Sequence, residues 1–280
     1  MIEIIRETIV DSVKLLPFLF LTFLFIEYLE HKMKNKNKEV ITNSKKLGPL
    51  FGGLLGAFPQ CGFSVSITNL YATRVITLGT LIAVYLSTSD EMLPIMLSEN
   101  VDIKIILMII LIKVIIGIIC GFIIDFILRK KESKEKITEF CEHEHCECKN
   151  NIFISSIKHT LNIFIFILLI SFVLNVCFEY LDTNFIKEIF SKNSFIGPLV
   201  SSFIGLIPNC ASSVMITELY LNNIITFGSL MAGLLTGSGV AIVVLFKINK
   251  NIKENFSILL TIYLLGVVFG TIFKLIVFTI

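Results

Sequence analysis

The stretch that decides the fold is GPLFGGLLGAFPQCGFSVSITNLY at residues 48–71, because the chain contains it twice. Residues 197–220 read GPLVSSFIGLIPNCASSVMITELY, so each residue lies 149 positions after its counterpart. Residues 48–89 and 197–238 are identical at about 19 of 42 positions, where composition alone would give roughly three or four. A duplication built around apolar segments that Gly and Pro interrupt is typical of secondary transporters.

The composition is that of a membrane protein. Of the 280 residues, 55% are hydrophobic and only 16% are charged, with a mean hydropathy of +0.85. A soluble protein of this size has too few charges here to cover so much apolar surface. Long apolar runs at 15–26, 103–128, 163–176 and 256–273 predict helices that cross a bilayer. The first run has no small-residue cleavage site after it, which favours a retained helix over a signal peptide.

The sequence therefore predicts an all-α polytopic membrane protein made of two membrane repeats, residues 1–129 and 152–280. A cytosolic loop rich in Cys and His, residues 130–151, joins them. Each repeat contains one hairpin of two short helices whose arms give about 17–20 Å, against an apolar bilayer core of about 30 Å. These hairpins are predicted to be re-entrant, at residues 48–73 and 197–222. A broken helix follows each hairpin, at 75–98 and at 224–246.

Placement of Lys and Arg predicts how the repeats lie in the membrane. Loop 30–47 is strongly basic, which places it on the cytoplasmic side, whereas its counterpart 182–196 contains only Lys187 and Lys192. The two hairpins are then expected to approach from opposite sides of the bilayer. This predicts an inverted topology for the two repeats, independently of the duplication itself.

The hairpin tips and the helix breaks are the predicted site. Interrupted helices leave backbone groups unpaired at membrane depth, which is tolerated only inside protein or along a polar cavity. We therefore expect the tips and breaks to meet near the middle of the bilayer. The residues predicted to bind the transported species are Gln60, Cys61, Asn69, Ser87, Asp90, Glu91, Asn209, Cys210 and Glu218.

Charged side chains at this depth are costly and usually functional. Asp90, Glu91 and Glu218 would supply carboxylates for a cation or for protons. Lys113 lies near the middle of its apolar segment and is predicted to be a coupling or counter-ion residue. The alternatives are that Asp90 and Glu91 merely end a helix near the membrane surface, and that Lys113 forms a structural salt bridge.

The connecting loop has a separate signal. Thiols and imidazoles at close spacing suit zinc, copper, nickel or cobalt. The predicted metal ligands are Cys141, His143, His145, Cys146 and Cys148, with a solvated polar linker as the alternative. Seven cysteines, an odd number and clustered with His, favour thiols in a reducing compartment over a disulfide framework.

Other classes of function find little support. The chain has no glycine-rich phosphate loop and no zinc-protease pair of His residues, so we expect no enzyme and no resident cofactor. No basic-aromatic pattern suggests nucleic acid as a partner. Without a nucleotide-binding domain, transport would depend on an ion gradient or on the gradient of the substrate. A passive channel and a membrane-bound metal sensor remain as other hypotheses.

Four motifs carry a resemblance to a known family. The sequences at 59–64, 87–94, 141–148 and 208–211 resemble those of the bacterial ten-segment heavy-metal exporters, also labelled arsenic efflux proteins or manganese transporters. The resemblance covers nearly the whole chain. It implies a multi-pass protein of the bacterial cytoplasmic membrane that exports a metal or metalloid. Its partners would be the lipid bilayer and the transported ion. The sequence is also compatible with a homo-oligomer.

The ligand preferences of manganese and arsenic help to choose between these candidate substrates. Manganese prefers oxygen ligands, which the carboxylates and amides of the predicted site supply. Trivalent arsenic prefers thiols, and only Cys61 and Cys210 would lie near the middle of the bilayer. We therefore predict secondary active export of a divalent transition metal, with Mn²⁺ as the preferred candidate, by alternating access around the paired hairpin tips. Efflux of arsenite or organoarsenicals is the alternative.

Overall fold

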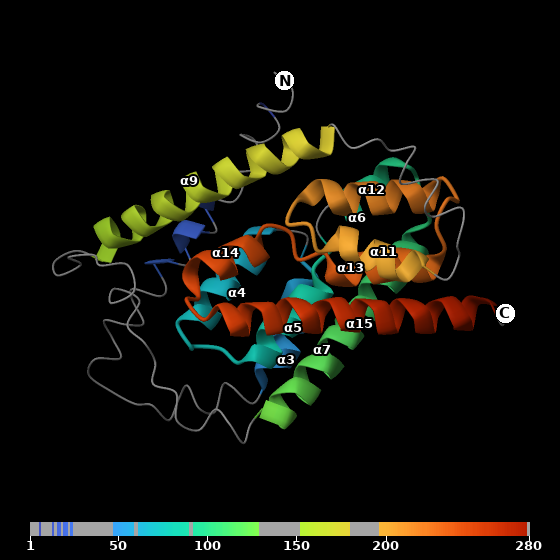
Figure 1. Cartoon of the computed structure of the whole chain (residues 1–280), viewed down its shortest axis with the longest axis horizontal. Coiled ribbons are helices and arrows are strands. Elements are labelled where there is room, and N and C mark those ends of the chain that lie inside the picture. The colour runs from blue at the N-terminus through green and yellow to red at the C-terminus, as the bar shows by residue number, and fades with distance from the viewer. Residues whose placement is uncertain are drawn as a thin grey trace.

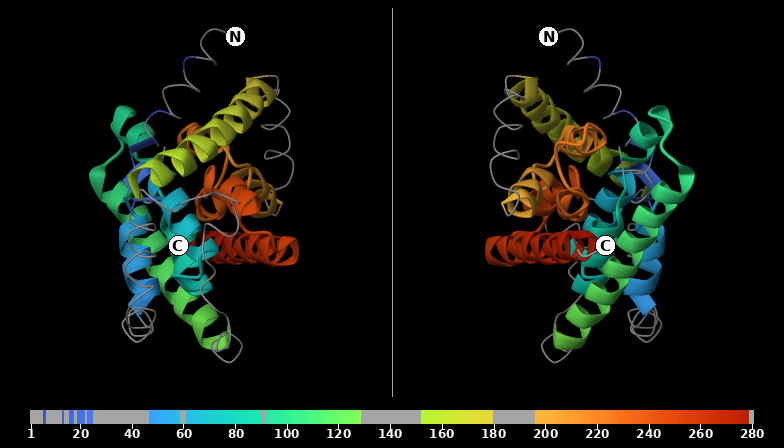
Figure 2. Two further views of the ribbon diagram at one scale, coloured as in Figure 1. Left: turned by 90° about the vertical axis from the view of Figure 1, so that its left-hand side faces the viewer. Right: turned by 90° about the vertical axis from the view of Figure 1, so that its right-hand side faces the viewer.

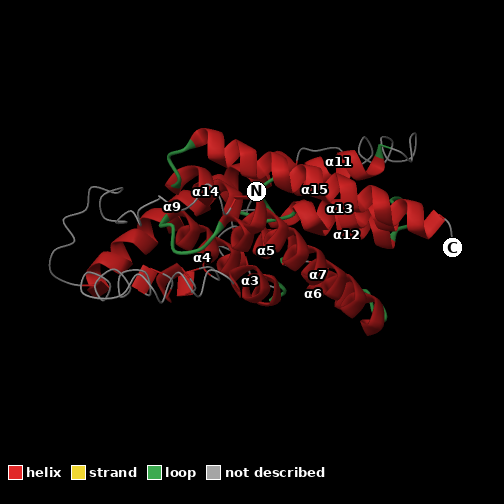
Figure 3. Ribbon diagram, turned by 90° about the horizontal axis from the view of Figure 1, so that it is seen from below, coloured by secondary structure: helices red, strands yellow, loops and turns green. Residues whose placement is uncertain are grey.

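The structure, a computed structural model, describes residues 47–58, 61–89, 92–128, 152–179 and 196–278, with isolated positions between residues 6 and 24. Throughout these ranges the regular elements are helices and no strand occurs (Figure 3). The predicted all-α class is confirmed. The helices are α3 (Gly48–Gly56), α4 (Cys61–Ala72), α5 (Leu78–Ser87), α6 (Met92–Ser98), α7 (Ile103–Leu128), α9 (Ile152–Glu179), α11 (Gly197–Gly205), α12 (Cys210–Leu221), α13 (Phe227–Thr236), α14 (Ala241–Ile248) and α15 (Ile252–Phe278).

The duplication in the sequence is repeated in the helix boundaries. Helices α11, α12 and α13 begin and end 149 positions after α3, α4 and α5. Pro49 and Pro198 stand in the first turns of α3 and α11, where proline has no hydrogen bond to lose. Thr77 and Thr226 cap α5 and α13, each accepting from the backbone N–H three residues on. Equivalent local signals therefore produce equivalent helices, whereas the inverted orientation of the repeats stays a prediction.

Both predicted hairpins and both predicted breaks are present as pairs of short helices. α3 is separated from α4, and α11 from α12, by only a few residues. α5 ends at Ser87 before α6 begins at Met92, and α13 ends at Thr236 before α14 begins at Ala241. The second break contains Gly239, whose φ of 56° is left-handed and strains any residue with a Cβ. The described residues of the two breaks, 88–89 and 237–240, are buried inside the protein.

Within each repeat, glycines bring two backbones into close contact. A Cβ on Gly79 of α5 would lie 2.1 Å from the carbonyl oxygen of Gly121 on α7. A Cβ on Gly228 of α13 would lie 2.5 Å from the carbonyl oxygen of Gly270 on α15. α3 packs on α5 and α7 in the first repeat, as α11 packs on α13 and α15 in the second. Each repeat therefore contains one tightly packed unit of three helices.

The remaining helices of the hairpins and breaks cross between the repeats. α4 of the first repeat packs on α14 of the second, and α12 of the second packs on α6 of the first. α5 and α13, the two helices that end at the breaks, also contact each other. These contacts are reciprocal, as expected when two copies of one unit face each other. Figure 1 shows α9 along one side of the molecule, where it contacts α14.

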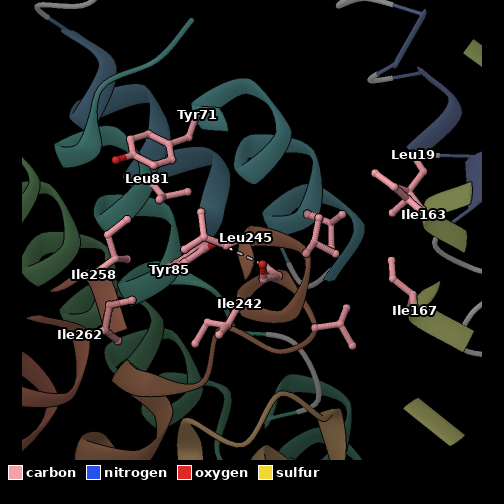
Figure 4. Packing of buried hydrophobic residues seen from close by; sticks show 14 of the residues in the cluster. Leu19, Tyr71, Leu81, Tyr85, Ile163, Ile167, Ile242, Leu245, Ile258 and Ile262 are labelled. Atoms are coloured by element: carbon pink, nitrogen blue, oxygen red, sulfur yellow. Dashed lines mark hydrogen bonds between the residues drawn. The ribbon is translucent and has the colours of Figure 1, made fainter. Parts of the chain in front are cut away.

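The largest hydrophobic cluster lies where α4 and α14 cross. Tyr85 of α5 is fully buried there beside Leu245 of α14 and Ile262 of α15 (Figure 4). Two smaller clusters fill the space around α6, α12 and α13 and the space between α5, α7 and α13. Each hydrophobic cluster thus contains residues of both repeats, and together the clusters lie around the two breaks.

Four helical segments of the described chain are long and apolar enough to cross a membrane: Ile103–Leu128, Ser156–Val173, Phe227–Ile248 and Ile252–Ile276. The long helices α7 and α15 run in different directions on the outside of their repeats (Figure 2). Both present large exposed apolar side chains, such as Leu111 and Phe126 on α7 and Leu260 and Leu264 on α15. Such surfaces suit lipid contact. The chain is a multi-pass membrane protein.

Candidate functional site

The two helix breaks meet at one buried ammonium group. Lys113 of α7 is only 1% exposed. Its Nζ donates to the backbone carbonyl of Thr88, in the first break, and to that of Leu234, 2.8 Å away near the end of α13. The lysine therefore joins the ends of two half-helices that belong to different repeats.

These carbonyls accept from Lys113 because the breaks release them from the helical ladder. An uninterrupted helix would pair the carbonyl of Leu234 with the N–H of Ser238. Here that N–H donates to the carbonyl of Thr236 instead, at 2.9 Å. Thr88 leaves the helical conformation with ψ of 130°, so the carbonyl of Thr88 also points out of the ladder. Both helix ends carry partial negative charge, which favours a cation at this place.

A chain of hydroxyl groups lies beside the same breaks. Ser64 of α4 is hydrogen-bonded to Thr88 at 3.0 Å, and Thr68 of α4 to Tyr85 of α5 at 2.6 Å. The Tyr85 hydroxyl also donates to the carbonyl of Ala241, the first residue of α14, at 3.4 Å (Figure 4). α4, α5 and α14 are thus connected by buried polar groups as well as by the apolar core.

Three buried side chains near these elements have no hydrogen-bond partner among the described residues. They are Asn69 on α4, both of whose amide atoms lack one, Ser201 on α11 and Ser238 in the second break. Each is at most 1% exposed. Burial of an unpaired polar group costs about 1–3 kcal/mol. A polar ligand or a water molecule at this place would supply the hydrogen-bond partners that these groups lack.

The predicted residues of the second hairpin tip, Asn209 and Cys210, also stabilise the local structure. Asn209 is buried and caps α12, accepting from the N–H of Ala211 at 3.3 Å. Cys210 begins α12 and is half-buried against the largest hydrophobic cluster. Asn209 is thus the buried residue of this tip, whereas the convergence of the two tips stays a prediction. The first-repeat counterpart of Cys210, Cys61, begins α4.

Ser87 and Glu218 lie in different surroundings. Ser87 is completely buried at the end of α5 and donates to the carbonyl of Val84 at 3.1 Å. Glu218 is exposed near the end of α12, away from the hairpin tip. The structure thus brings Asn69, Ser87 and Lys113 into the buried interior and leaves Glu218 on the surface of its helix.

Several predicted residues lie outside the described part of the chain. They are Gln60, Asp90, Glu91, the side chain of Cys61, and the loop ligands Cys141, His143, His145, Cys146 and Cys148. Over the described residues, no group of three or more His, Cys, Asp or Glu side chains is arranged to hold a metal ion. The described contribution to a cation site consists of neutral oxygens and of the lysine.

The hydroxyl chain was not predicted from the sequence, although the repeat carries a signal for it. Ser64 and Thr68 recur as Ser213 and Thr217, and in both pairs the threonine hydroxyl donates to the serine carbonyl, at 2.7 and 2.8 Å. Polar pairs one helical turn apart that survive in both copies of a membrane repeat mark a buried polar face. Tyr85 could not be found in this way, because the matching position of the second repeat is the apolar Leu234.

The fold and the site define a class: an all-α, multi-pass membrane protein in which paired helix breaks enclose buried polar groups. The chain belongs to the family described as "Putative, 10TM heavy-metal exporter", whose model matches residues 1–185 and 171–280 and so covers the whole chain. The resemblance inferred from the four motifs is confirmed. No curated protein and no solved structure matches the chain.

Proposed function

We propose that this protein is a secondary active transporter that exports a divalent transition-metal cation, with Mn²⁺ as the preferred substrate. The observation that carries the proposal is the unpartnered amide of Asn69, fully buried on the arm of the first hairpin. Its oxygen and the Ser238 hydroxyl, together with the predicted carboxylates Asp90 and Glu91, would form an oxygen-rich set. Such a set suits Mn²⁺ better than the softer metals.

Alternating access follows from the way the helices are divided. The glycine contacts make α5 with α7, and α13 with α15, stiff pairs that move as units. The arms α4 and α12 each pack on the other repeat, at α14 and α6. A rocking motion of one unit against the other would open one of these cross-contacts while the other stays closed. The metal would then reach the breaks from one side at a time.

Most of the predicted residues have a part in this cycle. Asp90, Glu91, Asn69 and Ser87 would bind the ion at the first break, with Gln60 and Asn209 at the hairpin tips. Glu218, exposed on α12, would attract cations along the access route. The loop ligands at 141–148 would capture metal on the cytoplasmic side of the bacterial inner membrane. Export as the direction follows from the family to which the chain belongs.

Efflux of arsenite or organoarsenicals is the second candidate, and the two hairpin cysteines favour it. Cys61 and Cys210 begin α4 and α12 at matching positions of the repeat, each directly after a tip. Two thiols that approach each other would bind trivalent arsenic. In that case the carboxylates at the break would be dispensable and the cysteines would be essential.

The test is the metal and arsenic content of cells, measured by mass spectrometry under separate loads of Mn²⁺, Zn²⁺ and arsenite. Cells would carry the wild type, Asp90→Asn/Glu91→Gln, or Cys61→Ser/Cys210→Ser. Lower cellular Mn²⁺ with the wild type and with the cysteine variant, but not with the acid variant, supports the proposal. Lower arsenic that depends on the cysteines, with Mn²⁺ unchanged, replaces it with the second candidate. No change in any load with the wild type overturns both.

A further inference from the structure

We propose that Lys113 is a tethered cation: its ammonium group fills a monovalent cation site formed by the ends of two half-helices. In a transporter with broken helices, released carbonyls and half-helix C-termini are the groups that bind a coupling Na⁺. Here the carbonyls of Thr88 and Leu234 meet that description, and the ammonium occupies the place between them. The protein would thus use its own ammonium group at a place where other transporters with broken helices bind a free Na⁺.

The two described acceptors are those of a cation site. Both are backbone carbonyls from the C-terminal ends of helices, α5 and α13, so the two helix dipoles present their negative ends to one point. The distance of 2.8 Å from Nζ to the Leu234 oxygen is that of a direct contact without water between. Neutral carbonyls at such range replace the hydration shell of monovalent ions.

The enclosure supports the same inference. Ile82, Leu86, Ile116 and Leu235 form a buried apolar cluster between α5, α7 and α13, and Lys113 lies one helical turn before Ile116. A cation in such surroundings needs direct ligands, because water is excluded and desolvation is expensive. A lysine on the lipid-facing side of a membrane helix would instead reach toward the surface with its long side chain.

One ammonium serves both repeats. The position that corresponds to Lys113 on α15 is Ile262, which is completely buried in the largest hydrophobic cluster. Each repeat supplies one released carbonyl, at positions that do not correspond (Thr88 matches Gly237, and Leu234 matches Tyr85), but only the first repeat supplies a cation. Because Lys113 contacts both breaks, replacement of its charge should affect the two repeats together.

The experiment measures thermal unfolding of the purified full-length chain in detergent, in chloride salts of sodium, potassium, ammonium, methylammonium and choline at equal ionic strength. The variants Lys113→Ala and Lys113→Ser remove the tethered cation and leave room for a free one. We expect at least one small cation to raise the unfolding midpoint of these variants, saturably and relative to choline. The wild type should unfold at the same temperature in all five salts.

Two matched variants complete the design. Lys113→Arg keeps a tethered cation and leaves no room for a free one, so it should not respond to the salts. Lys104→Ala removes an exposed lysine from the first turn of the same helix and should behave as the wild type. A midpoint of Lys113→Ala and Lys113→Ser that is the same in every salt overturns the proposal. Failure to recover these variants in any salt overturns it as well, because a free cation then does not replace the ammonium.

The functional consequence rests on the proposed transport activity. In vesicles, metal transport by the wild type should need neither Na⁺ nor K⁺, whereas transport by Lys113→Ala should depend on the cation that stabilises it. Because the unfolding experiment needs no transport, the two proposals fail separately. A wild type that moves no metal, together with a cation-responsive Lys113→Ala, removes the transporter and keeps the cation site.

Discussion

Arg74 and Glu254 form a two-point ion pair that ties the two repeats together. Nη1 lies 2.6 Å from Oε1 and Nη2 lies 2.8 Å from Oε2, and the Tyr71 hydroxyl donates to the same carboxylate. Arg74 follows α4 in the first repeat, and Glu254 lies in the first turn of α15 in the second. Arg74 has a φ of 60°, which is strained for arginine, and its counterpart Asn223 has a φ of 58°. The ion pair offsets a backbone conformation that suits asparagine better.

The variant Arg74→Asn separates these two effects, because it places the residue of the second repeat in the first. Loss of a partly buried two-point ion pair should cost about 2–3 kcal/mol, and relief of the left-handed strain should return about 1 kcal/mol. We expect a net loss of about 1–2 kcal/mol, seen as a lower midpoint of thermal unfolding. Asn223→Gly is the control and should unfold at or slightly above the wild-type midpoint. A rise in midpoint with Arg74→Asn would mean that strain outweighs the ion pair.

Reversal of the charges tests whether the contact between repeats matters for transport. Glu254→Arg should lose both stability and metal transport, because two cations then face each other beside Tyr71. The double variant Arg74→Glu/Glu254→Arg should recover a part of each. The measurements are the unfolding midpoint and metal uptake into vesicles. Recovery of both would show that the pair acts only by holding the repeats together. Recovery of stability without recovery of transport would show that transport needs the native arrangement of the two charges.

The buried amide of Asn69 predicts a conflict between stability and function. Since neither amide atom has a described partner, Asn69→Leu removes an unsatisfied polar group and should leave the unfolding midpoint unchanged or raise it. The same variant should lose metal transport, because a leucine supplies no oxygen ligand. Unaltered transport by Asn69→Leu would remove Asn69 from the site.

Asn255 offers the matched control. It is also completely buried, but its amide accepts from Asn249 at 2.8 Å and donates to the Asn249 carbonyl at 2.8 Å. Asn255→Leu leaves the groups of Asn249 unpaired and should cost about 2–4 kcal/mol. A parallel fall in midpoint for Asn69→Leu and Asn255→Leu would contradict the view that the Asn69 amide awaits a ligand.

Helix boundaries could be predicted from the sequence because local signals set them twice. Gly48-Pro49 and Gly197-Pro198 begin the same helix in each repeat, and the tips end it. The carbonyl partners of Lys113 could not be predicted, because they depend on which helix ends the tertiary fold brings together. A pattern of residue types shows that a break exists but not what its released carbonyls meet.

Glu218 shows where the repeat misleads. It corresponds to Asn69, yet Asn69 is buried and Glu218 is exposed. On α12, Ser212, Ile216 and Leu219 form the buried face, and Glu218 points about 200° away from Ile216 at 100° per residue. Most described side chains of α4 are buried, whereas on α12 only Ser212, Ile216, Thr217 and Leu219 are. Equal positions in two repeats therefore do not imply equal surroundings.

The glycine contacts between α5 and α7 predict a steep loss of stability on small substitutions. A Cβ at Gly79 would meet the Gly121 carbonyl and the Asp125 carboxylate, which accepts from the Gly79 N–H at 2.8 Å. Gly79→Ala should therefore force the two helices apart and cost about 3 kcal/mol or more. The measurement is the unfolding midpoint together with the yield of folded protein.

Gly237 is the matched control for this prediction. It lies in the second break with φ of −72°, and a Cβ there would meet only side-chain and backbone atoms at 3.1 Å or more. Gly237→Ala should therefore change stability by less than about 1 kcal/mol. A comparable fall for both variants would mean that helix propensity or general loosening, and not the close backbone contact, explains the effect.

Tyr85 predicts a change in rate without a change in affinity. Its hydroxyl joins Thr68 on α4 to the carbonyl of Ala241 on α14, so it holds the two repeats in the observed arrangement. Tyr85→Phe keeps the packing and removes about 1 kcal/mol of hydrogen bonding. If α4 must separate from α14 during transport, the maximal rate should rise by up to about fivefold, with the metal concentration for half-maximal transport unchanged. Tyr263→Phe on α15, whose hydroxyl has no described partner, should leave both quantities as in the wild type. A fall in rate with Tyr85→Phe would instead show that α4 and α14 move together through the cycle.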